Sequence, residues 1–433
     1  MLFLFYLSLL PWTRYTPFPS LPVKIIWADL FFIPLCFKAA FFFWRLRKPA
    51  VFHFFEKSAL LLLGILTIHV VFLYPSLRSF LKLAGMGYLF LILFVLKAFI
   101  HQERDLKQIF WIWFWISLGL SISGIVAYGV SQWQNQPNFF VLKDSAYLGG
   151  GKYLWRLWSI GYTPSMLAAY LHVGVVGALW LQAGEKDKKR PFFWFFSILF
   201  ILAAILLGKS RMFLGVFVTL MVWEWYQWRS AQRLRRFFTI LFSLFVFGCS
   251  VLVAGSVWCR ITPILLDFEQ NRIHISWNQE PSHYQFRNRL AFALWKEHPF
   301  IGAGLGKFQT YSQSCESIFA KQDPGFFQEI PSDWLKTPHD PHSTYQGALA
   351  ETGMFGMSAI FVFLFSVVYS LWCSIRQSTD PITQRRMITF FAGIIGFLIH
   401  GFYLDILTLR YFWYLLGFIS LYILFSKETI QEL

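Results

Sequence analysis

A histidine at the meeting point of a polar loop and an apolar run is the side chain best suited to chemistry. His342 follows Pro341 and precedes Ser343, and the apolar run begins at Tyr345. An imidazole titrates near neutral pH and can act as a general base. At a boundary between water and lipid, His342 could activate a polar molecule for reaction with a lipid-linked one. The alternative is a structural histidine that forms a hydrogen bond at the loop–helix junction.

The residues next to His342 raise two further points. The segment Pro338-His339-Asp340-Pro341-His342 resembles a set of metal ligands. Its two prolines hold it extended, so the imidazoles would not share a helix face as they do in zinc motifs, and we expect no metal there. Gly353 and Gly356 follow at a spacing of three, which predicts a helix face that another helix can approach closely.

Arg211 lies in the short turn Lys209-Ser210-Arg211 between two apolar runs. Charged side chains at membrane depth are costly and usually face a cavity, which favours a binding role. The alternative is an arginine whose guanidinium reaches back to the lipid headgroups.

Arg287 and Arg289 open a predicted amphipathic helix that ends before Pro299. Arg287 would lie near the amino-terminal end, where backbone N–H groups and the helix dipole favour anions. A guanidinium binds phosphate oxygens in a bidentate manner, so Arg211 and Arg287 together could bind a pyrophosphate. The glycine-rich segment 302–306 follows no strand and opens no long helix, which indicates a structural turn rather than a nucleotide-binding loop.

These residues would be positioned by membrane helices. The chain is 57% hydrophobic and 14% charged, whereas soluble domains carry roughly 25% charge. Its apolar runs can span a hydrocarbon layer of ~30 Å. We therefore predict an all-α polytopic membrane protein of about 12 transmembrane helices with one large helical periplasmic loop. The expected spans are 2–11, Val23–Trp44, Ser58–Tyr74, Ala84–Ile100, Ile109–Val130, Tyr162–Ala183, Phe192–Gly208, Met212–Trp228, Phe238–Trp258, Tyr345–Trp372, Met387–Phe402 and Tyr411–Phe425.

Three parts are expected: an N-terminal transmembrane bundle (1–257), a periplasmic loop domain (258–344) and C-terminal transmembrane helices (345–433). Lys and Arg concentrate in connectors that alternation places on one side, which predicts that side to be cytoplasmic. The same bias explains the net charge of +16 without a nucleic-acid partner. The Leu2–Leu10 run lacks a preceding basic region, so we expect no cleavable signal of the usual kind. Cys259 and Cys315 could be a disulfide or two thiols.

The motifs have a familiar arrangement. His342-Ser343, nine residues, and Gly353-Met354-Phe355-Gly356 match the pattern H-[NSQ]-x9-G-x-x-G, and Ser343 stands where Asn is common. The segments Ala28-Asp29-Leu30, Lys209-Ser210-Arg211 and 298–304 precede it in the same order. In these features the chain resembles the bacterial O-antigen ligase family, and the pattern is shared with O-antigen polymerases and protein O-oligosaccharyltransferases.

The resemblance implies a metal-independent glycosyltransferase without a cofactor, in the bacterial inner membrane with its active site facing the periplasm. The donor would be a glycan on undecaprenyl pyrophosphate, and the acceptor a sugar hydroxyl of lipid A-core. His342 would be the catalytic base, and Arg211 and Arg287 would bind the pyrophosphate, with Arg289 as a helper. Reaction would invert the anomeric carbon.

Two alternatives stay open. A polymerase or protein O-oligosaccharyltransferase of the same superfamily would share the motif. A transporter of lipid-linked glycans would carry ionisable groups in the middle of its spans, whereas here the polar groups gather at one face.

Overall fold

The computed structural model describes residues 2–11, 27–46, 53–144, 154–158, 163–185, 191–227, 265–267, 272–274, 283–313, 315–322 and 339–431. The predicted span Phe238–Trp258 and the thiol of Cys259 lie outside these residues. The expected division into three parts therefore remains a prediction.

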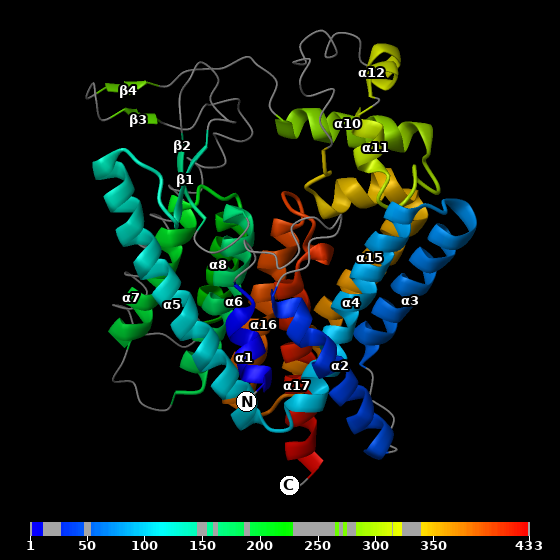
Figure 1. Ribbon diagram of the computed structural model, residues 1–433. Coiled ribbons are helices and arrows are strands. Elements are labelled where there is room, and N and C mark those ends of the chain that lie inside the picture. The colour runs from blue at the N-terminus through cyan, green and yellow to red at the C-terminus, as the bar shows by residue number, and fades with distance from the viewer. Residues whose placement is uncertain are drawn as a thin grey trace.

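Long helices form a bundle, and shorter ones cover one of its ends (Figure 1). The bundle helices are α1 (Leu2–Leu9), α2 (Trp27–Leu46), α3 (Phe54–Ile68) with its π-helical extension η1 (His69–Leu73), α4 (Leu77–Phe99), α5 (Glu103–Gln134), α6 (Pro164–Ala183), α7 (Pro191–Leu207), α8 (Phe213–Gln227), α15 (Thr344–Gln377), α16 (Pro381–His400) and α17 (Arg410–Gln431). The covering helices are α10 (His283–Glu297), α11 (Phe308–Gln313) and α12 (Glu316–Gln322). We call the end that they cover the capped end; both chain termini lie at the other end.

Six of the described helices are long and apolar enough to cross a membrane: α3 with η1, α4, α5, α6, α15 and α16. Three shorter apolar helices are Phe193–Leu207, Phe213–Tyr226 and Arg410–Ser426. The chain is thus a mostly helical, polytopic membrane protein, as the composition predicts. The number of about 12 spans stays a prediction.

The helices begin where the sequence supplies capping side chains. Ser76, Thr163 and Asp380 accept hydrogen bonds from backbone N–H groups in the first turns of α4, α6 and α16. Such side chains satisfy donors that have no partner within the helix. α6 lies at the centre, with 89% of its apolar window buried against 39% for α3 with η1. The outer helices therefore direct much of their apolar surface toward lipid.

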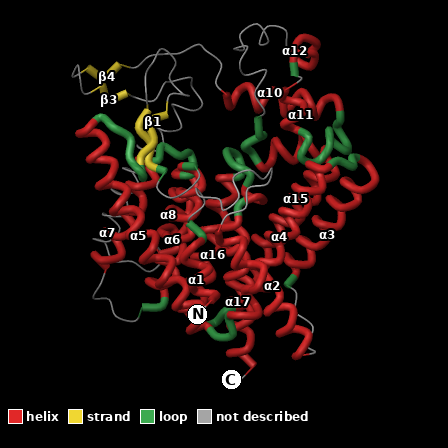
Figure 2. The backbone as a smooth tube through the Cα atoms, in the orientation of Figure 1, coloured by secondary structure: helices red, strands yellow, loops and turns green. Residues whose placement is uncertain are grey.

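Two short antiparallel strand pairs depart from the all-α prediction (Figure 2). β1 (Val141–Asp144) pairs with β2 (Leu154–Leu157), and β3 (Leu265–Asp267) pairs with β4 (Arg272–His274). Both pairs lie in connectors, where backbone groups outside helices find partners in each other. In the first pair, the fully buried Leu157 packs against Gly124 of α5. This contact attaches the strand pair to the bundle.

The covering helices have a small core of their own. Phe286, Leu290 and Leu294 of α10 pack with Phe308 and Phe319 of α11 and α12. Ala350 of α15 belongs to the same buried cluster. The cap is therefore packed directly on the helix that follows His342.

Candidate functional site

His342 is held at the capped end by its two neighbours in sequence. Its backbone φ is 50°, in the left-handed region that non-glycine residues seldom occupy. The next residue, Ser343, caps α15 and donates its Oγ hydrogen to the carbonyl oxygen of Gly401 at 3.1 Å. Thr344 N–H donates to the same oxygen at 2.8 Å. The backbone next to the half-buried His342 is thus fixed to the loop that follows α16.

Gly353 has a different use from the one its spacing predicts. Its φ of 61° and ψ of −161° interrupt α15, and a Cβ atom there would overlap the Phe300 backbone. The freed N–H groups of Met354 and Phe355 donate to the carbonyl oxygens of Pro299 and Phe300 at 2.9 and 3.1 Å. The partner that approaches Gly353 is therefore the turn after α10, because only glycine readily adopts this backbone conformation.

Arg287 lies next to the segment that carries the histidine. Its Nη2 is 3.5 Å from Nδ1 of His339. The neighbouring Phe286 ring contacts the His339 ring edge-on, with centroids 5.1 Å apart. Arg287 is half-buried, whereas Arg289, two positions along α10, is exposed. Of the two predicted arginines, Arg287 is the one on the face of α10 toward His339.

Arg211 reaches the same region from the turn between α7 and α8. Its guanidinium carbon lies 5.7 Å from the ring centre of Tyr403. Tyr403 belongs to the loop whose Gly401 carbonyl accepts the hydrogen bonds of Ser343 and Thr344. Arg211 therefore contacts the loop to which the residues after His342 are hydrogen-bonded.

Arg156 of β2 is a further arginine in this region, which the sequence did not point to. Its Nε and Nη2 donate to the carbonyl oxygens of Gly208 and Lys209 at 3.3 and 3.5 Å. Lys209 has a φ of 47°, and partial desolvation, followed by the Arg156 charge, lowers its pKa to about 8. The Arg156 guanidinium thus stabilises the turn that carries Arg211 through these two hydrogen bonds. The feature of the sequence that could have pointed to Arg156 is its position in the otherwise apolar stretch Leu154–Leu157.

The electrostatics of His342 connect these groups. Burial, followed by the charge of Arg287, lowers the pKa of His342 to about 4. Asp340 opposes this change, whereas His339 and Arg211 add to it. His342 is consequently neutral at pH 7, with one ring nitrogen able to accept a proton. Both Arg287 and Arg211 are close enough to affect its charge.

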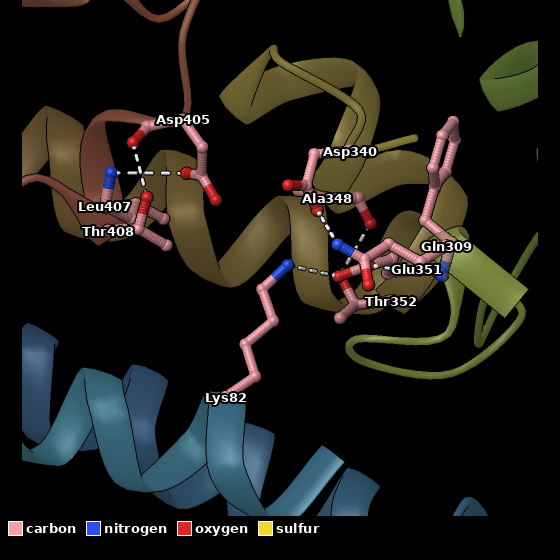
Figure 3. A network of polar contacts seen from close by, with 10 residues as sticks. Lys82, Gln309, Asp340, Ala348, Glu351, Thr352, Asp405, Leu407 and Thr408 are labelled. Atoms are coloured by element: carbon pink, nitrogen blue, oxygen red, sulfur yellow. Dashed lines mark hydrogen bonds and ion pairs between the residues drawn. The ribbon is translucent and has the colours of Figure 1, made fainter. Parts of the chain in front are cut away.

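A buried carboxylate on α15, the helix that follows His342, joins three elements (Figure 3). Glu351 of α15 forms an ion pair with Lys82 of α4 at 2.6 Å and accepts a bond from Phe308 N–H at 3.4 Å. Beside it, Gln309 of α11 donates to Asp340 at 2.7 Å. The motif pattern did not single out Lys82 or Glu351. A carboxylate inside an apolar run, which is costly without a partner, was the signal.

The acidic Asp405 lies on the other side of Lys82 (Figure 3). Its carboxylate accepts a bond from Leu407 N–H at 3.3 Å. Burial raises the pKa of Asp405, and the Lys82 charge opposes this.

In the described residues no three His, Cys, Asp or Glu side chains are arranged to hold a metal ion. Cys315 is a buried free thiol that donates to the Ser312 carbonyl oxygen at 3.1 Å.

Comparison with known proteins gives a family match for part of the chain. Residues 195–361 match the model of a family described as O-antigen ligase. The matched range runs from within α7 to the middle of α15 and contains His342, Arg211, Arg287 and Arg289. Enzymes of this family transfer lipid-linked glycans. No curated protein matches the chain.

Proposed function

We propose, from the premise that residues 195–361 form an O-antigen ligase domain, that this protein is an O-antigen ligase. It transfers a glycan from undecaprenyl pyrophosphate to a sugar hydroxyl of lipid A-core. The capped end faces the periplasm from the bacterial inner membrane. The observation that carries this proposal is that Arg287 contacts His339, three residues before His342, and that the charges of Arg287 and Arg211 both act on a neutral His342.

The reaction follows from the charges at the site. His342 accepts the proton of the acceptor hydroxyl, and the hydroxyl oxygen attacks the anomeric carbon of the donor sugar. The bond between that carbon and the pyrophosphate oxygen breaks, and its electron pair stays with the lipid pyrophosphate. Attack opposite the leaving group inverts the anomeric carbon. General-base catalysis contributes about 10²–10⁴-fold to such a step.

Arg287 and Arg211 bind the pyrophosphate and stabilise the charge that it gains on leaving. Fixed cations near a developing charge are most effective where water is excluded. A pyrophosphate is a good leaving group, so no general acid is needed. Arg289 is an additional contact at the exposed side of α10, where it can meet the outer part of the donor.

Donor binding also strengthens the base. In the free protein the two guanidinium groups disfavour a protonated His342. The negative charges of the pyrophosphate offset these cations, so the pKa of His342 rises when the donor is bound. An imidazole with a higher pKa accepts a proton more readily, which places activation of the acceptor after binding of the donor.

The test is His342→Ala in a bacterial strain that lacks its own ligase. We expect normal insertion of the variant into the membrane and loss of polymer-bearing lipopolysaccharide. Polymer-bearing lipopolysaccharide at the wild-type level would refute the assignment of the base. His342→Gln, which retains hydrogen bonding without a titratable ring, should be equally inactive. A structural histidine would tolerate that change better.

A strain that lacks this protein but keeps its other glycan enzymes separates ligase from polymerase. Shorter O-antigen chains that are still attached to the lipid A-core would instead indicate an O-antigen polymerase, which shares the family. A purified protein that releases no lipid pyrophosphate when given donor and acceptor would indicate a transporter.

A further inference from the structure

An open hollow at the capped end has no part in the reaction described above. It measures about 500 Å³ and lies between the start of α4 and α11, a size typical of sites for small organic ligands. The residues lining it are Ser76, Leu77, Arg78, Lys307, Thr310 and Tyr311. Two of them are cations, three carry hydroxyl groups and none is acidic. This lining suits an anionic ligand that also has hydroxyl groups.

The two cations are held in position at the hollow. Arg78 Nη1 donates to Thr310 Oγ1 at 3.2 Å, which joins α4 to α11. Lys307 Nζ lies 4.9 Å from the ring centre of Tyr74. Gly304 has a φ of 113°, and a Cβ atom there would lie 2.8 Å from Lys307 Cδ and 3.1 Å from Tyr74 Cγ. Glycine at this position therefore allows the turn to pack against both side chains.

The hollow borders the lipid-facing surface of the bundle. Phe72 at the end of η1 and Leu77 at the start of α4 are 76% and 74% exposed. In a membrane protein such apolar side chains face acyl chains. A ligand in the hollow could therefore be anchored in lipid while its polar head group contacts Arg78 and Lys307.

The hollow is also connected to the His342 site. α11 contributes Thr310 and Tyr311 to the hollow. Gln309, the residue of α11 that precedes Thr310, donates a hydrogen bond to Asp340 (Figure 3). Asp340 precedes His342 by two residues. On the other wall, Arg78 and Lys82 are four residues apart on one face of α4. A head group in the hollow thus lies beside the segment that carries the base.

We propose that this hollow is an acceptor subsite that binds a phosphorylated sugar of the lipid-anchored acceptor glycan. The inference rests on the proposed function and extends it to the recognition of the second substrate. Arg78 and Lys307 form charge-assisted hydrogen bonds with the phosphate. The positive end of the α4 dipole favours the same anion, in addition to the Ser76 side chain that caps the Ser79 N–H.

A phospholipid headgroup carries the same phosphate chemistry. The hollow favours a sugar, because a volume of about 500 Å³ lined by three hydroxyl-bearing residues exceeds what one phosphate group fills. The connection through Gln309 to the His342 segment also gives an acceptor sugar a reason to bind there. A structural phospholipid would gain nothing from that connection.

The experiment compares two acceptors in a transfer assay with purified full-length protein and saturating donor. One is lipid A-core with phosphorylated core sugars, and the other is the same material after chemical dephosphorylation. For the double variant Arg78→Gln/Lys307→Gln we expect the KM for the phosphorylated acceptor to rise about tenfold, as for loss of hydrogen bonds to a charged group. The kcat and the KM for the donor should stay within twofold. The preference of the wild type for the phosphorylated acceptor should disappear.

Two further variants control for folding and for charge. Arg78→Lys/Lys307→Arg keeps both cations and should recover most of the acceptor affinity. Lys296→Gln removes an exposed cation on α10, where its Nζ lies 4.8 Å from the Phe292 ring centre, and should leave both KM values unchanged. An unchanged acceptor KM in the double Gln variant would overturn the proposal. So would an equal loss with the dephosphorylated acceptor.

A binding measurement keeps this test separate from the test of the proposed function. If the wild type transfers glycan to neither acceptor, the proposed function fails, and binding of the two acceptors to protein in phosphatidylcholine nanodiscs tests the hollow alone. Phosphate-dependent binding that the double Gln variant loses would support the subsite. Absence of phosphate-dependent binding would overturn it. Equal competition by phosphatidylglycerol would assign the hollow to phospholipid and overturn it as well.

Discussion

At the scale of single residues, the base strength of His342 depends on the arginines around it. Burial and the charge of Arg287 lower its pKa to about 4, so the free protein keeps the imidazole neutral through most of the acid range. Activity requires this neutral form and is lost as the pH falls through the pKa. The acid limb of kcat/KM reports the free protein, whereas that of kcat reports the complex. We therefore expect the kcat/KM limb near pH 4 and the kcat limb at a higher pH, because bound pyrophosphate offsets the arginines.

The variant Arg287→Gln tests the cause of this shift. It removes one of the charges that disfavour protonated His342, so the acid limb of kcat/KM should move upward from pH 4. Profiles of rate against pH for wild type and variant provide the measurement. A wild-type limb near the ordinary histidine pKa of about 6.5 that Arg287→Gln does not move would contradict the electrostatic coupling.

At the scale of elements, the break in α15 fixes the turn after α10 to the helix that follows His342. Gly353→Ala places a side chain against the Phe300 backbone in a conformation that is essentially restricted to glycine. We expect a loss of at least ~2 kcal/mol in stability, together with loss of transfer activity. Thermal unfolding of the detergent-solubilised protein measures the first effect.

Gly85→Ala is the matched control for Gly353→Ala. Gly85 lies within α4, and no atom would approach an added Cβ there within 4 Å. Because alanine has the higher helix propensity, this change should be neutral or slightly stabilising. An equal loss of stability in both variants would argue against a special role for the break.

The ion pair between Lys82 and Glu351 joins α4 to α15, the helix that follows His342. Lys82→Met leaves the Glu351 carboxylate, 4% exposed, without its cation. Breaking a buried pair on one side costs about 3–5 kcal/mol, and the partial exposure of Lys82 places this case near the lower value. We expect a lower Tm for Lys82→Met. We also expect a lower rate of glycan transfer to the dephosphorylated acceptor. The double variant Lys82→Met/Glu351→Gln should recover more than half of the lost Tm; additive losses would show that the two side chains are uncoupled.

Apolar runs located the described helices well but not always their lengths. The predicted span Tyr162–Ala183 is observed as Pro164–Ala183, because Thr163 caps the helix and a proline follows. The span Ile109–Val130 becomes the longer helix Glu103–Gln134, since polar residues continue a helix beyond the apolar part. Hydropathy reports which residues suit lipid, and helices extend past them.

The candidate site, like the helices, could be predicted from the sequence only in part. The types and spacing of His342, Arg211 and Arg287 were sufficient to select residues that the fold brings together. Lys82 and Glu351 could not be paired from the sequence, because they are far apart in the chain and only the packing of α4 on α15 joins them. Lys97 of α4 likewise pairs with Glu56 of α3 at 2.6 Å, and these two residues are also far apart in the chain.

At the scale of the whole molecule, the capped end must face the periplasm if the donor and acceptor are to meet there. The rule that Lys and Arg remain on the cytoplasmic side predicts that the connection between α4 and α5, at the opposite end of the bundle, faces the cytoplasm. Exposed positions on the two ends allow a direct test: Lys296 on α10 and Arg104 at the start of α5. In a background with the five native cysteines replaced, a membrane-impermeant maleimide should label Lys296→Cys in cells with a permeabilised outer membrane. Arg104→Cys should react only after lysis. The reverse pattern would place His342 in the cytoplasm, where a periplasmic transfer reaction could not use it.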